Sequence, residues 1–135
     1  MARKKKLKGL VWFKPIIQGV EWTVILGSQK DYPKDLEGRE AVTLFDRALI
    51  IIDSALDPAR YPDCLQHELL HAIFHSCGLV NTLRNMDELP LTEKQADKLE
   101  ETIVYGISPV LYDTYLRNNI ANFPEIPTKK RRSRG

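Results

Sequence analysis

The sequence predicts an α+β fold, in which a small antiparallel or mixed sheet from the N-terminal half packs on two helices from the C-terminal half. Up to residue 57, short β-prone runs alternate with turn residues, whereas after residue 63 apolar residues recur at the spacing of helices. The chain has 135 residues, of which 43% are hydrophobic, enough for one compact domain and too few for two. We expect this domain to span residues 9–124, between basic disordered tails at residues 1–8 and 125–135.

Five segments of the N-terminal half have strand character and are separated by turn residues: 10–13, 16–17, 20–26, 40–46 and 48–52. The last of them, Ala48-Leu49-Ile50-Ile51-Ile52, is the most strongly β-prone, and we expect it to present an edge to which an extended peptide can pair. Residues 27–38 are polar, contain Pro33, and are predicted to form a loop.

The first predicted helix spans Asp63 to Cys77. Asp63 follows Pro62 and can cap the N-terminus, with Gln66 three residues later in a variant of the capping box. Gly78 is placed to end the helix in a left-handed conformation.

This helix contains the pattern H-E-x-x-H, as His67-Glu68-Leu69-Leu70-His71. Residues four apart lie about 40° apart around a helix, one turn above the other, so both imidazoles can reach one metal ion. In zinc peptidases with this pattern the glutamate takes a proton from water at the metal. The alternative is an amphipathic helix that happens to carry two partly buried histidines.

His75 lies one turn further along the helix. Burying three imidazoles without partners would be costly, which favours a metal site. For His75 itself we expect hydrogen bonding around that site or plain packing.

A second, longer helix is predicted from Thr92, which can cap it with Gln95 three residues later, to about Asn118. Apolar residues recur along it at helical spacing, and Pro109 predicts a kink near Tyr105. Residues 79–90 are expected to connect the two helices.

A catalytic zinc site needs a third protein ligand. The metzincin spacing H-E-x-x-H-x-x-G-x-x-H is not met, because Phe74 occupies the glycine place and Cys77 the place of the third histidine. The remaining common arrangement takes a glutamate from a second helix, and here this is Glu100 or Glu101.

With these elements the chain resembles small gluzincin-type zinc metallopeptidase-like proteins of phages and prophages and, more distantly, the ImmA/IrrE family. The matching elements are the strand 48–52, the helix around residues 65–72 and the later helix with Glu-Glu-Thr-Ile-Val; they cover about half of the chain. The resemblance implies two zincin helices, with Zn²⁺ held by His67, His71 and the second-helix glutamate. In such families the glutamate ligand tends to have a polar residue four positions on, which favours Glu101 with Tyr105. Glu100, the alternative, lies nearer the centre of the apolar stripe.

The implied reaction is peptide hydrolysis by metal-activated water, with Glu68 as the general base. Tyr105 and Tyr112 are candidates for stabilising the oxyanion. Residues 27–38 and 79–90 would form the substrate pockets, and they contain no pattern that indicates a preference for particular substrate side chains.

The charge of the chain is divided between its ends and its middle. Residues 1–8 and 129–135 hold ten basic side chains and no acid, whereas the other 120 residues hold ten basic and eighteen acidic side chains, a formal −8. The basic ends are solvated tails, or they contact nucleic acid or acidic surfaces weakly and without sequence readout.

The sequence also indicates a compartment. Cys64 and Cys77 lie on one predicted helix roughly 20 Å apart, too far for a disulfide. With no export signal and no membrane-spanning run, we expect a cytoplasmic protein.

Three function classes remain. The first is a zinc metallopeptidase with a protein or peptide substrate. The second is a non-catalytic binding, assembly or regulatory protein in which zinc stabilises the fold, and for which the resemblance implies a phage origin. The third is a nucleic-acid-associated protein in which the tails dominate.

Overall fold

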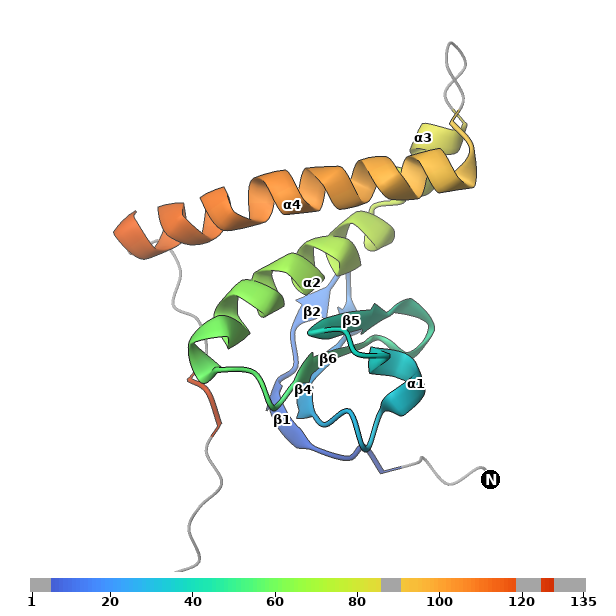
Figure 1. Cartoon of the computed structure of the whole chain (residues 1–135). Coiled ribbons are helices and arrows are strands. Elements are labelled where there is room, and N and C mark those ends of the chain that lie inside the picture. The colour runs from blue at the N-terminus through green and yellow to red at the C-terminus, as the bar shows by residue number, and fades with distance from the viewer. Residues whose placement is uncertain (1–5, 86–90, 119–124, 128–135) are drawn as a thin grey trace, which may run out of the picture.

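A four-stranded mixed sheet forms most of the N-terminal half (Figure 1). Its strands lie side by side in the order β1 (Leu10–Phe13), β4 (Thr23–Gly27), β6 (Leu49–Asp53) and β5 (Ala41–Leu44). The central pair β4 and β6 is parallel, and the two outer pairs are antiparallel. Two short strands, β2 (Ile16–Ile17) and β3 (Val20–Glu21), form a separate hairpin.

Helices make up the second half of the chain. The long helices are α2 (Tyr61–Ser76) and α4 (Glu93–Asn118), and the short ones are α1 (Pro33–Leu36) and α3 (Leu79–Arg84). Single 3-10 turns occupy Phe45–Arg47 and Pro58–Arg60. Helix α2 lies between the sheet and α4, so the molecule has three layers (Figure 1).

This computed structural model describes residues 6–85, 91–118 and 125–127. Within these ranges no helix is long and apolar enough to cross a membrane. The predicted α+β class and the small mixed sheet are confirmed.

The helix ends follow the local signals, with one correction. Gly78 adopts the left-handed conformation (φ 70°) after α2, as predicted. Thr92 and Gln95 form the predicted capping box, in which each side chain accepts a hydrogen bond from the other residue's backbone N–H. The predicted start at Asp63 was wrong, because α2 already begins at Tyr61 and takes Pro62 into its first turn, where a proline needs no N–H partner.

Three predictions about the strands and loops were wrong. The strand 48–52 is not an edge, because β6 pairs with β4 on one side and β5 on the other; the edge strands of this sheet are β1 and β5. The segment 20–26 is not one strand but divides at Trp22 into β3 and β4. The predicted loops 27–38 and 79–90 contain α1 and α3.

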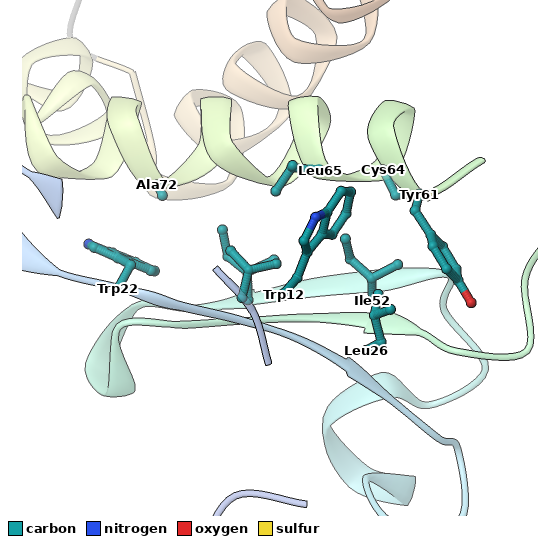
Figure 2. Close-up of a cluster of buried hydrophobic side chains, with 10 residues drawn as sticks. Trp12, Trp22, Leu26, Ile52, Tyr61, Cys64, Leu65 and Ala72 are labelled. Atoms are coloured by element: carbon teal, nitrogen blue, oxygen red, sulfur yellow. The ribbon is translucent and has the colours of Figure 1, made fainter. Parts of the chain in front are cut away.

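The apolar core fills the space between the sheet and α2 (Figure 2). Leu65 and Ala72 of α2 face Trp12, Trp22 and the central strands, and all of these side chains are buried. A second cluster, on the other face of the sheet, joins Ile25, Ile51 and Leu49 to Leu36 of α1 and to Tyr32. No described residue of α4 belongs to either cluster.

Residues just outside both predicted domain boundaries, in the predicted tails, contact the buried clusters. The Tyr32 hydroxyl accepts a hydrogen bond from the Lys8 N–H and donates one to the Lys8 carbonyl. Ile126 packs against the cluster under α2. The other basic residues of the two predicted tails lie outside the described part of the chain, apart from Lys6.

Candidate metal centre

His67 and His71 project from α2 toward α4, and their ring centroids are 5.0 Å apart. Both rings are largely buried, with 20% and 13% of their side-chain surface exposed. The helical spacing therefore does what the sequence predicts, and it turns both Nε2 atoms toward the same partner on α4.

That partner is Glu101. Its carboxylate oxygens lie 3.3 Å from His67 Nε2 and 3.1 Å from His71 Nε2. One ligand atom from each residue of this trio lies within 4.8 Å of the others. Tetrahedral zinc, with bonds of about 2.0–2.2 Å, holds its ligand atoms about 3.3–3.6 Å apart. The donor types and spacing therefore fit such an ion.

Glu100 is buried and lies on the other side of His71, with Oε1 2.8 Å from Nδ1. Both ring nitrogens of His71 therefore face carboxylate oxygens. A neutral imidazole has one N–H and one lone pair, so one of these contacts must be bridged by a further proton or by a cation. Burial disfavours the charged ring, but the hydrogen bond to Glu100 and the charges of Glu101 and Glu68 outweigh it and raise the pKa of His71.

Glu68 is buried against the edge strand β5. The Thr43 hydroxyl donates to its carboxylate and also lies 3.2 Å from its backbone carbonyl. Because a hydroxyl has one hydrogen, it can serve the ionised carboxylate as a donor, or accept from the protonated acid and donate to the carbonyl. Burial raises the pKa of Glu68, against the lowering effects of Thr43 and the two histidines.

These residues line one open hollow of about 1110 Å³ between β5, α2 and α4. Tyr105 stands over it with 66% of its surface exposed and its ring edge-on to His67, at a centroid distance of 4.7 Å. The side chain of Tyr112, the other tyrosine predicted to stabilise an oxyanion, lies outside the described part of the structure.

The remaining candidates have structural partners. His75 stacks on Phe45 at 4.2 Å, which agrees with packing. Asp53, at the end of β6, accepts hydrogen bonds from the Ala55 N–H in the following turn and from the Gln29 side chain. The two cysteines form no disulfide, as predicted. The pKa of Cys64 is raised to about 11, mainly by burial, so its thiol stays protonated at neutral pH.

The structure adds one residue, Thr43, and one role, that of Glu100, that the sequence did not indicate. Thr43 lies 25 positions from Glu68, and a threonine in a strand has no pattern that indicates such a contact. The sequence indicates Glu100 only as an alternative metal ligand, whereas in the structure its carboxylate bonds Nδ1 of His71. A signal for that second role exists only in the general tendency of metal-binding histidines to donate to a carboxylate.

The chain matches no protein-family model, no curated protein and no solved structure. The resemblance to gluzincins therefore rests on the residues and their geometry alone.

Proposed function

We propose that this protein is a zinc-dependent peptidase of the gluzincin type, similar to the small H-E-x-x-H proteins of phages. The observation that supports this most directly is the convergence of His67, His71 and Glu101 within 4.8 Å, beside a buried Glu68 and an open hollow. Two imidazoles and one carboxylate are the ligand set of catalytic zinc in this class, and they leave a fourth position for water.

Zinc, when bound, lowers the pKa of a coordinated water and polarises the substrate carbonyl. The protein's own residues then handle protons and position. Glu68 accepts the proton of the attacking water and passes it to the leaving amine. Thr43 can pair with both protonation states of Glu68, so this transfer leaves no unpaired buried group. Tyr105, beside His67, can donate its hydroxyl proton toward the developing oxyanion.

The free edge of β5 supports a peptide substrate. This strand lines the hollow through Ala41, Val42 and Thr43, and among the described residues its backbone pairs with β6 on one side only. An extended peptide can add to such an edge through main-chain hydrogen bonds. Because Thr43 also contacts Glu68, a peptide on this edge would pass next to the proposed base.

The test is Glu68→Gln in the zinc-loaded full chain. We expect zinc content to stay at one ion per chain and the rate of peptide cleavage to fall about 10²- to 10⁴-fold, because the proton acceptor is removed and the ligands are kept. Glu21→Gln, an exposed position on β3 that does not line the hollow, is the matched control and should cleave normally. Cleavage that survives Glu68→Gln would refute the proposed base.

A non-catalytic role for zinc is the second candidate, and the layer between α2 and α4 favours it. The described buried positions of α4 are Ala96, Glu100, Val104 and Ser108, which supply little apolar surface. A zinc ion held by residues of both helices would cross-link this weak layer. Stoichiometric zinc with no hydrolysis of any protein or peptide would favour this candidate over the peptidase.

A further inference from the structure

The hollow has two chemically different ends, which follow from the antiparallel course of α2 and α4 (Figure 1). Along α2, His67 meets Tyr105 and His71 meets Glu100, so each step forward on α2 is a step back on α4. The same register places Asp97 opposite His75, one turn beyond the metal ligands.

The end near the start of β5 is balanced in charge. Arg60 forms two hydrogen bonds with the Glu40 carboxylate, at 2.5 and 2.7 Å. Asp63 and Arg39 also line this end, one of each sign. No net charge is left here to select a peptide.

The other end is acidic and aromatic. Asp97 and Glu93 line it, and both are exposed; Glu93 lies only loosely against Arg84, at 3.8 Å. Phe45 and His75 form a nearly parallel stack there, with an interplanar angle of 20°. Within the described ranges, Arg39 and Arg60 are the only lysines or arginines that line the hollow, and both belong to the balanced end.

A separate observation indicates that the hollow takes an occupant. Ser108 lines the hollow beyond Tyr105, toward its balanced end, and is 2% exposed, yet its hydroxyl has no hydrogen-bond partner among the residues the structure describes. A buried hydroxyl without a partner is costly, and polar groups of a peptide in the cleft would supply one.

We propose that the acidic end binds a lysine or arginine side chain of the peptide, so that the substrates are basic peptides. A carboxylate pairs with either cation, and an aromatic face adds a cation–π contact that favours arginine. In an extended peptide, side chains two residues apart point the same way and lie about 6.7 Å apart. This distance is close to the rise of one helical turn between His71 and His75, so a peptide side chain two positions from the metal would lie near the acidic end. This inference rests on the proposed function, since it names the substrate class of the same site.

The experiment uses the zinc-loaded Glu68→Gln full chain, which keeps the ligands and does not turn over. A dodecapeptide library with randomised positions is captured on it and sequenced. The best binder is then compared with a twin in which citrulline replaces arginine, which keeps the shape and removes the charge. We expect enrichment of lysine and arginine, and about tenfold tighter binding of the arginine peptide, by fluorescence anisotropy at low salt.

Asp97→Asn should weaken binding of the arginine peptide about fivefold and leave the citrulline twin unchanged. Asp63→Asn, at the balanced end, is the matched control and should change neither. A library without enrichment, equal affinity for the twins, or an arginine preference that is undiminished in Asp97→Asn would overturn the inference.

Cleavage by the wild-type chain separates this inference from the proposed function. Cleavage of both twins at equal rates would keep the peptidase and refute the basic specificity. Discrimination between the twins without any cleavage would keep the basic-peptide site and refute the peptidase.

Discussion

The two faces of α2 are buried in different ways. Toward the sheet, α2 buries apolar side chains such as Leu65 and Ala72 against two tryptophans and the central strands. Toward α4, it presents two histidines to two glutamates. The first face stabilises the fold by removing apolar surface from water. The second face buries polar groups, which must find hydrogen-bond or ion partners. Helix α2 therefore contributes both to the apolar layer that stabilises the fold and to the polar layer that could bind an ion.

Of the changes predicted here, zinc removal should give the largest difference in stability between these two layers. A ligand present at about a thousand times its Kd stabilises a protein by about 4 kcal/mol, and a chelator removes this. We expect hydrogen exchange of α4 amides to accelerate strongly with chelator, while β6 amides stay protected, because the proposed ligands come from α2 and α4 and none from the sheet. Equal acceleration in both elements, or none in α4, would contradict the comparison.

Leu65→Ala tests the apolar layer. Leu65 is fully buried, so the truncation should lower the free energy of unfolding by about 2–5 kcal/mol, with little change in zinc affinity. Val104→Ala is the counterpart on α4 and should cost about 1–3 kcal/mol while also weakening zinc binding. Urea unfolding with zinc and zinc titration of each variant measure both effects. A loss of zinc affinity from Leu65→Ala as large as that from Val104→Ala would mean that the layers are not independent.

The same comparison explains what could be predicted from the sequence. The end of α2 at Gly78, the capping box of Thr92 and the pairing of His67 with His71 depend on residues within one helical turn, and all three predictions agree with the structure. The start at Tyr61 was missed because Asp63 gave a stronger local signal than the proline before it.

Long-range relations could not be predicted in this way. The parallel pairing of β4 with β6 moves the strongest strand to the centre, and nothing within Leu49–Asp53 indicates its neighbours. The division of roles between Glu100 and Glu101 depends on how α4 is rotated against α2, since adjacent residues point about 100° apart. The predicted kink near Tyr105 stays a prediction.

The variant Glu100→Gln tests the proposed difference in role between Glu100 and Glu101. Loss of the carboxylate that bonds His71 Nδ1 should weaken zinc binding about 10- to 100-fold without abolishing it, because the three proposed ligands remain. Glu101→Gln should abolish stoichiometric zinc under the same conditions. Competition with a chromophoric chelator measures both, with Glu93→Gln as control. The opposite order, with zinc retained in Glu101→Gln and lost in Glu100→Gln, would make Glu100 the ligand.

Thr43→Val should have the smallest effect and tests the edge strand rather than the ion. The Thr43 hydrogen bond lowers the pKa of Glu68 against the larger raising effect of burial, so its loss should raise that pKa further. A base acts only when ionised, so the acidic limb of the kcat/KM profile should move to higher pH, with activity about three- to tenfold lower at neutral pH and zinc affinity unchanged. Thr43→Ser keeps the hydroxyl and should restore the wild-type profile. If Thr43→Val lowers activity equally at every pH, the hydroxyl positions the strand and does not adjust the base, and the link between the peptide-binding edge and Glu68 would be lost.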